Sequence, residues 1–264
     1  RASLEANKGA YSYAWMIIFA VIAAIMVLIG LYHIRMLPSN QIPSTTKKTT
    51  SEVGRELVAV IANFFTKKHI FYYICFIILY RLAEGFIMKI APLFLRASRE
   101  VGGLGLSLKE IGTLNGVFGS AAFVLGSLLA GIYVSKFGLK RTLFTLCCIF
   151  NLPFLAYTFL AVTQPTNVYL IGTCITMEYF GYGFGFVGLT LFMMQQIAPG
   201  KHQMSHYAFA SGIMNLGVML PGMVSGYFSD LLGYRNFFIY VLIATIPAFL
   251  ITYFIPFAYD DSKK

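Results

Sequence analysis

Three charged side chains lie within one apolar stretch of the chain. The run from residue 70 to residue 95 contains Arg81, Glu84 and Lys89. Because an α-helix turns by about 100° per residue, Glu84 would lie about 60° to one side of Arg81 and Lys89 about 80° to the other. A charge that faces lipid is costly, so we expect this shared face to point into a bundle of helices.

These groups could bind anions and move a proton. In a water-filled path, Arg81 and Lys89 would attract anionic groups, and Glu84 would take up or release a proton. A structural alternative stays open, because Arg81 and Glu84 are three residues apart and could pair with each other to brace neighbouring helices. That alternative would leave Lys89 without a partner in its own stretch.

A further carboxyl group, that of Glu178, lies near the centre of the apolar run from residue 167 to residue 192. On a helix, Gly181, Tyr182 and Gly185 would lie within about 60° of it, so the carboxyl group would stand beside bare backbone and a phenol. Glu178 could pair with a basic residue of the other stretch or carry a proton, or it could be protonated and bind a neighbouring helix. The candidate substrate and proton path therefore comprises Arg81, Glu84, Lys89, Glu178, Tyr182, Asn115 and Asn215.

The composition indicates that membrane-spanning helices hold these residues. Of the 264 residues, 58% are hydrophobic and 11% charged, against roughly 25% charged in an ordinary soluble domain. Several apolar runs are longer than the roughly 20 residues that a helix needs to cross a bilayer. We predict an all-α integral membrane protein with seven spans, at about 11–32, 70–95, 108–134, 139–162, 167–192, 204–229 and 235–257.

The distribution of charge predicts the orientation. The net charge is +10, but Lys and Arg lie in short connections between apolar runs, so we expect no nucleic acid as partner. With the N-terminus outside, the cytoplasmic segments would hold twelve Lys and Arg and the outer segments six. The positive-inside rule favours this orientation, with the C-terminus in the cytoplasm. We therefore predict a multi-pass protein of the inner (cytoplasmic) membrane.

One connection differs from the others in composition. Residues 35–52 are rich in Pro, Ser, Thr and Lys, as is typical of a solvated linker. The next residues repeat apolar side chains at helical spacing, which predicts a short helix on the inner membrane surface or, alternatively, an extension of the next span. That apolar stripe comprises Val53, Leu57, Ile61 and Phe64. We predict three parts: a span in residues 1–32, a basic linker with this helix in 33–69, and a six-helix unit in 70–264.

Two stretches of the six-helix unit resemble each other. "GIYVSKFGLKR" begins at Gly131 and "GYFSDLLGYR" begins at Gly226. Each ends a Gly-rich span and is expected to make a tight turn, at Gly138 or at Gly233, before the next span begins. Each also follows the second span of a set of three, so we predict a three-plus-three arrangement.

These stretches resemble the loop motif of the major facilitator superfamily, in which Gly, three residues, Asp, two residues and Gly precede a basic cluster. Here Ser135 stands at the Asp position of the first stretch, so the match is degenerate. The resemblance implies a gating loop at Gly131, Ser135, Gly138, Lys140, Arg141, Asp230 and Gly233. It also implies that residues 11–32 are the last span of a first six-helix half, that 70–257 form the second half, and that further spans precede Arg1.

Within this superfamily, two segments look like the muropeptide permeases of the AmpG type. They are "YRLAEGFIMKIAPLFL" and "MEYFGYGFGFVGLTLFMMQQIAP", which carry a similar Arg and Glu pair and a Glu before a Gly-rich aromatic run. The resemblance implies a proton-coupled symporter that imports a polar, partly anionic solute, such as an anhydro-muropeptide, by alternating access between two halves. Its partners would be that solute, protons, the bilayer and the missing N-terminal half.

Other classes of protein fit the residues less well. A complete seven-helix receptor is the alternative, but the long connection follows the first span, and the last span has no Lys to hold retinal. The sequence contains no nucleophile paired with a base, no metal-ligand cluster and no phosphate-binding loop that would suggest an enzyme. We therefore expect neither a cofactor nor a metal site. His202 and His206 have metal-like spacing, which we interpret as two residues of a solvated loop.

Overall fold

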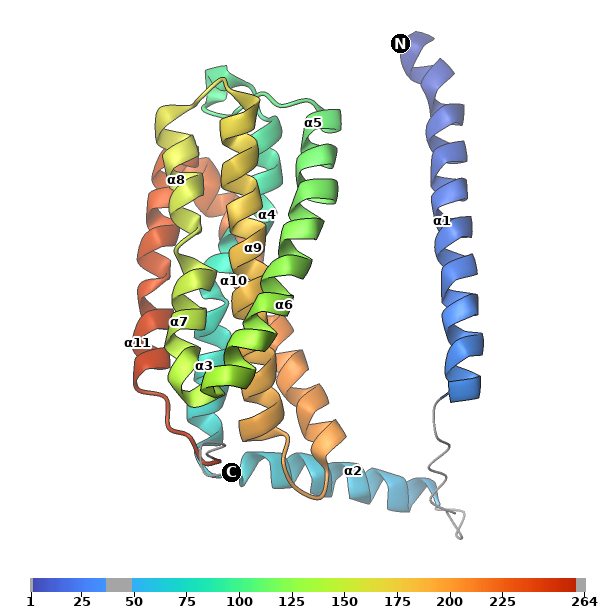
Figure 1. Ribbon diagram of the computed structural model, residues 1–264, viewed down its shortest axis with the longest axis vertical. Coiled ribbons are helices and arrows are strands. Elements are labelled where there is room, and N and C mark those ends of the chain that lie inside the picture. The colour runs from blue at the N-terminus through green and yellow to red at the C-terminus, as the bar shows by residue number, and fades with distance from the viewer. Residues whose placement is uncertain (1, 37–48, 260–264) are drawn as a thin grey trace. The chain divides into compact units, whose positions relative to one another are not determined.

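The computed structural model describes residues 2–36 and 49–259, which form two compact units, Arg1–Glu52 and Val53–Lys264. All the regular secondary structure in these described residues is helical, as predicted (Figure 1). Most of the predicted solvated linker, residues 37–48, lies outside the described residues, as do residues 260–264. The division into three parts at residues 32 and 69 stays a prediction.

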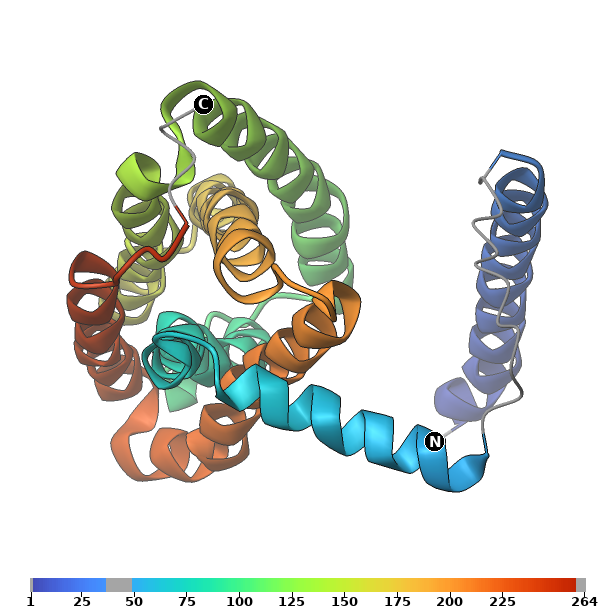
Figure 2. The same cartoon turned by 90° about the horizontal axis from the view of Figure 1, so that it is seen from below.

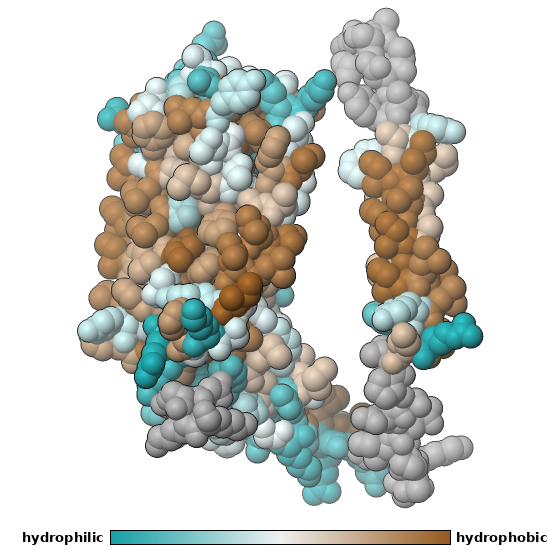
Figure 3. Space-filling view, viewed as in Figure 1, coloured by the Kyte–Doolittle hydropathy of each residue, from teal (hydrophilic) through white to brown (hydrophobic). Residues whose placement is uncertain are grey.

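The first unit contains one long helix, α1 (Ala2–Met36). Its residues from Ser12 to Met36 are exposed, except for Gly30, which is half-buried. Almost every residue from Trp15 to Leu31 is apolar, so apolar side chains occur all around the helix, and Figure 3 shows them on the face in view. Such a helix is typical of a membrane span. Ser12–Met36 is accordingly long and apolar enough to cross a bilayer.

The second unit is a bundle whose helices run along its long axis, with α2 crossing one end (Figures 1 and 2). Apolar side chains form a band around its middle, and polar side chains gather at both ends (Figure 3). Its elements are α2 (Thr50–Phe65, which begins in the first unit), α3 (Ile70–Tyr80), α4 (Leu82–Arg96), the 3₁₀-helix η1 (Arg99–Val101), α5 (Leu108–Thr113), the π-helix η2 (Leu114–Gly119), α6 (Ser120–Phe137), α7 (Leu139–Asn151), α8 (Phe154–Thr163), α9 (Val168–Phe192), the π-helix η3 (Met193–Ile197), α10 (Gln203–Ala244) and α11 (Ile246–Tyr253).

By length and hydropathy, the described residues contain five candidate membrane spans. They are Ser12–Met36, Ile70–Arg96, Leu108–Phe137, Leu139–Thr163 and Gln203–Tyr253. The last contains two of the predicted spans, and α9, a helix of 25 residues, is not a candidate because its glycines, tyrosines and Glu178 lower its hydropathy. The number of seven spans and the three-plus-three arrangement therefore stay predictions.

Two clusters of buried side chains form the core of the second unit. One includes Phe76 and Tyr80 of α3, and the other includes Ala83 and Phe94 of α4. The junction between α3 and α4, at Arg81, therefore lies where one apolar cluster ends and the other begins.

Glycines bring the backbones of α6 and α9 into close contact. A Cβ atom added at Gly126 would meet the carbonyl oxygen of Phe180, and one added at Gly183 would meet the backbone of Phe123. The Ser127 hydroxyl also donates a hydrogen bond to the carbonyl oxygen of Gly183, at 3.1 Å. Small residues at such crossings are typical of packing between membrane helices.

The two similar stretches make the same backbone turn. Gly138 has φ 78° and ψ 149°, and Gly233 has φ 70° and ψ 161°. Side-chain-bearing residues rarely adopt this conformation, which glycine reaches without a steric penalty. The predicted turn at each glycine is thus confirmed, and the internal similarity extends from sequence to backbone geometry.

We predict that changing either turn glycine to alanine destabilises the protein. Nothing lies within 4 Å of a Cβ atom added at Gly138 or Gly233, so the cost of Gly138→Ala or Gly233→Ala would be conformational alone, about 1–3 kcal/mol. The apparent melting temperature in nanodiscs should fall for both variants. Gly131→Ala and Gly226→Ala are matched controls in open, helical positions and should be neutral or slightly stabilising. Equal melting temperatures for all four variants would contradict the argument.

His206 differs from the sequence interpretation. We expected His202 and His206 in a solvated loop, but His206 lies in α10 with 0% of its surface exposed. Its Nε2 atom is 3.3 Å from the carbonyl oxygen of Val60, and its ring lies 5.7 Å from that of Phe64. The expectation was wrong because α2 packs over the first turns of α10 and covers this side chain.

Candidate functional site

Arg81 interrupts the helix that carries it. The sequence predicts one span over residues 70–95, but α3 ends at Tyr80 and α4 begins at Leu82, with Arg81 between them at φ −103° and ψ 7°. This backbone conformation is sparsely populated and is found at many functional residues. In membrane transporters, interrupted helices commonly form binding sites, because the break frees backbone and side-chain groups near the midplane.

Arg81 and Glu84 form a buried, bidentate ion pair at this break, at the start of α4. The Arg81 Nε atom donates to one Glu84 carboxylate oxygen at 2.6 Å, and Nη2 donates to the other at 2.5 Å. Nη2 also lies 3.4 Å from the Tyr182 hydroxyl, and the guanidinium carbon lies 5.4 Å from the centre of the Phe186 ring. The predicted pair therefore forms, while Nη1 makes no hydrogen bond to the described residues.

A cavity of about 170 Å³ with both apolar and polar lining lies beside the ion pair, where α4, η2, α8 and α9 meet. Its polar lining combines Glu84 with residues from three other helices, so segments far apart in the sequence build it. Those lining residues are Glu84, Asn115, Tyr157, Glu178, Tyr179 and Tyr182. Four of the seven predicted path residues thus line one cavity, and Arg81 contacts two of these four.

Asn115 and Glu178 bring unused polar atoms to this cavity. Asn115 lies in the π-helix η2, and its buried Oδ1 atom has no hydrogen-bond partner among the described residues. Glu178 is half-buried on α9 and makes neither a hydrogen bond nor an ion pair with another described residue. Because a buried polar atom without a partner is costly, such atoms commonly mark the place where a ligand or water binds.

The structure does not bring Lys89 and Asn215 to this cavity. Lys89 is exposed on α4, with its aliphatic stem near Gly222, and Asn215 is exposed on α10. Glu84 and Lys89 lie on the same unbroken helix, α4, where five residues separate them by about 140°, so the packing that buries Glu84 leaves Lys89 facing outward. The parts that Lys89 and Asn215 would play in a transport path stay predictions.

Three residues that the sequence interpretation did not single out support the site. The Tyr80 hydroxyl donates to the carbonyl oxygen of Gly185 at 2.9 Å and so ties α3 to α9. Tyr157 lines the cavity from α8, and Phe186 lies against the Arg81 guanidinium. Each lies in an apolar run like any packing aromatic residue, so no local signal could have distinguished it.

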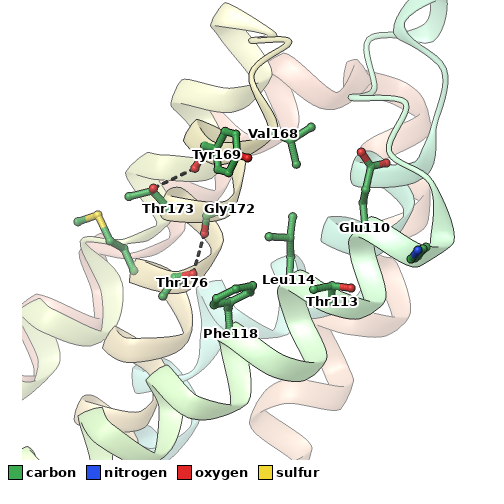
Figure 4. A pocket seen from close by; sticks show the side chains of 11 residues that line it. Glu110, Thr113, Leu114, Phe118, Val168, Tyr169, Gly172, Thr173 and Thr176 are labelled. Atoms are coloured by element: carbon green, nitrogen blue, oxygen red, sulfur yellow. Dashed lines mark hydrogen bonds between the residues drawn. The ribbon is translucent and has the colours of Figure 1, made fainter.

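A larger cavity, of about 690 Å³, lies between the start of α9 and the α5–η2 segment (Figure 4). Two of its hydroxyl groups are already used, because Thr173 donates to the Tyr169 carbonyl at 2.9 Å and Thr176 to the Gly172 carbonyl at 2.7 Å. At its edge, Glu110 accepts the backbone hydrogen bond of a helix-capping box. The smaller cavity, with its unused polar atoms, is therefore the better candidate.

The arrangement can bind a polar, partly charged ligand and exchange a proton. The Arg81 Nη1 group supplies donors to an anion, and Asn115 and the tyrosines can hydrogen-bond hydroxyl or amide groups. Glu178, which has no basic partner among the described residues, can bind a proton or a cationic group. The residues that the family resemblance predicts to act in gating lie elsewhere, at the turns around Gly138 and Gly233.

Residues 9–199 match the model of the family described as "Major Facilitator Superfamily". An "Anhydromuropeptide permease" of Escherichia coli (strain K12) is 23% identical over 209 residues, which are 79% of this chain and 41% of that protein.

Two relatives from Rickettsia also match. A "Putative transporter AmpG 1" of Rickettsia bellii is 25% identical, covering 89% of this chain and 56% of the relative. A "Putative transporter AmpG 2" of Rickettsia prowazekii is 27% identical, with 74% and 46% covered. The chain spans about half the length of these curated relatives.

Proposed function

Because the chain belongs to the major facilitator superfamily, we propose that it is the second half of a proton-coupled permease that imports a polar, partly anionic solute. In this proposal the second unit forms one six-helix half, α1 ends the other half, and the two alternate between outward and inward access. The permease lies in the inner membrane, with the C-terminus of the chain in the cytoplasm. A seven-helix receptor is no longer the alternative, since the family is one of transporters.

One observation carries the proposal: the carboxylate of a buried ion pair, four further polar side chains and a second carboxyl group line one cavity within apolar helices. Ionisable groups in membrane spans are costly, and they are concentrated at substrate and ion pathways. An ion pair that served only to brace helices would explain Arg81 and Glu84. It would not explain the unpartnered Oδ1 atom of Asn115 or the carboxyl group of Glu178 on the same cavity.

We propose an anhydro-muropeptide as the solute, following the name of the Escherichia coli relative. Such a molecule combines sugar hydroxyls, amides and carboxylates. Asn115, Tyr179 and Tyr182 would hydrogen-bond its hydroxyl and amide groups, and Arg81 would bind a carboxylate through Nη1. Lys89 and Asn215, exposed on this unit, would contribute when the other half closes over the path.

Transport can be tested directly with the whole protein in proteoliposomes. We expect a labelled anhydro-muropeptide to accumulate when a proton gradient is imposed, and a protonophore to abolish that accumulation. Accumulation that survives collapse of the gradient would refute proton coupling. Accumulation of unrelated sugars or peptides, but not of the anhydro-muropeptide, would refute the proposed solute.

Glu178→Gln tests the proton role of this carboxyl group. Glutamine keeps the shape of glutamate but cannot take up or release a proton near neutral pH, so uptake should lose both its stimulation by the gradient and its dependence on pH. Glu110→Gln makes the same chemical change in the helix-capping box and should keep both properties. If Glu178→Gln transported like the unchanged protein at every pH, another group would carry the proton.

The two glycine turns are proposed to act as gating loops. Gly138 separates α6 from α7, Gly233 makes a kink within α10, and Lys140, Arg141 and Asp230 beside them are exposed. Charged groups at such turns could exchange partners with the opposite half as the halves rock.

A further inference from the structure

The helix α2 has an apolar surface that the second unit covers only in part. At about 100° per residue, its apolar side chains occupy an arc of about 160°, from Val60 through Phe64 and Leu57 to Ile61, Phe65 and Val58. Val60 is 7% exposed and Phe64 2%, whereas Leu57 is 54% exposed, Ile61 40%, Phe65 47% and Val58 67%. One edge of the arc is therefore buried, and the remaining part, Leu57, Val58, Ile61 and Phe65, forms what we call the outer face of α2.

The buried edge of α2 packs against the start of α10. The Phe64 ring packs on Phe209 and His206 of α10, at 5.7 Å from each ring. Just beyond α2, the Lys67 Nζ atom donates hydrogen bonds to the carbonyl oxygens of Ile197 and, at 2.7 Å, Pro199. Burial lowers the pKa of the Lys67 ammonium group from its ordinary value. The position of α2 is thus set by contacts with η3 and α10.

The place and direction of α2 suit a membrane surface. Figure 1 shows α2 crossing the end of a bundle whose other helices run along its long axis, and Figure 2 shows it extending beyond the bundle. If those helices cross the bilayer, α2 lies along the surface of one leaflet. Arg55 lies about 60° beyond Val58, at the border of the outer face, and Lys68 and Lys201 are exposed at the same end of the bundle.

We infer that the outer face of α2 inserts into one leaflet rich in anionic phospholipid and so ties the ends of α9 and α10 to the bilayer surface. Leu57, Val58, Ile61 and Phe65 would enter the boundary between headgroups and acyl chains, and Arg55 and Lys68 would reach the phosphate groups. The sequence predicted a surface helix with Phe64 on its stripe, but Phe64 packs on the protein, and the outer face begins beside it, about 20° further around the helix. The inference does not depend on the proposed transport activity.

Tryptophan fluorescence tests this arrangement in the intact protein. These 264 residues contain a single tryptophan, which Trp15→Phe removes, and any tryptophan elsewhere in the intact protein is likewise changed to Phe. Ile61→Trp and Leu57→Trp then place a probe on the outer face, and Ala59→Trp places one on the opposite, exposed side. In proteoliposomes with brominated acyl chains, we expect the first two probes to be quenched at least about two-fold more than the Ala59→Trp probe.

The other outcomes would overturn the inference. Equal quenching at all three sites would place α2 either in water or wholly within the bilayer. Protection of the Ile61→Trp probe from both brominated lipid and aqueous acrylamide would mean that a protein segment covers the outer face.

A second experiment tests whether the basic residues recognise anionic lipid. The double substitution Arg55→Gln and Lys68→Gln should remove the dependence of Ile61→Trp quenching on phosphatidylglycerol content. An undiminished dependence would show that anionic lipid is not recognised by these residues.

Discussion

Arg81→Ala is expected to abolish uptake and to destabilise the protein by about 3–5 kcal/mol, because it leaves Glu84 as a buried carboxylate without its cation. In the structure, Glu84 is 6% exposed and both of its oxygens accept hydrogen bonds from Arg81. Uptake into proteoliposomes and the apparent melting temperature in nanodiscs would measure the two effects. We expect uptake to fall to that of empty vesicles.

A double substitution separates a functional pair from a structural brace. Arg81→Met with Glu84→Leu removes both charges and keeps much of the side-chain volume, and such replacements of buried ion pairs are often neutral or stabilising. We therefore expect the double variant to regain stability but not uptake. If it transported like the unchanged protein, the pair would only brace α3 and α4, and the structural alternative raised by the sequence would be correct.

Gly183→Ala should cause the other large effect, a loss of stability of about 1–3 kcal/mol with reduced uptake. A Cβ atom at this position would lie 2.9 Å from the Phe123 carbonyl carbon and 3.0 Å from its Cα atom. Backbone atoms cannot rotate away as a side chain can, so α6 and α9 would have to separate. Because Tyr182 and Glu178 lie on α9, this separation would also disturb the cavity.

Gly212→Ala is the matched control for this packing argument. Gly212 is an exposed helical residue of α10, and nothing lies within 4 Å of a Cβ atom added there. Its apparent melting temperature should equal or exceed that of the unchanged protein. Should Gly183→Ala melt at the same temperature as Gly212→Ala, the contact between α6 and α9 would not limit stability.

Features that depend on neighbouring residues could be predicted from the sequence. Long apolar runs predict helices, because within lipid the backbone must satisfy its own hydrogen bonds. The Arg81 and Glu84 pair, three residues apart, and the turns at Gly138 and Gly233 were predicted in the same way. Each depends on spacing of only a few residues, and the structure contains each of them.

The tertiary structure alone decided which distant residues meet. It broke the helix at Arg81, and within the continuous α4 it buried Glu84 but left Lys89 exposed, although the sequence placed both on one inward face. It brought Asn115 and Glu178 to one cavity. These outcomes follow from how helices pack, through glycine contacts and aromatic side chains distributed over the whole unit.

The helix α2 shows the same division. Its sequence determines that it is helical and apolar along one wide arc, because both properties follow from residue type and spacing. Only its packing on α10 decides that Val60 and Phe64 bind the protein and leave Leu57, Ile61 and Phe65 exposed. Side chains of one apolar face are chemically alike, so their partners are set by the shape of the neighbouring surface, which residue spacing does not encode.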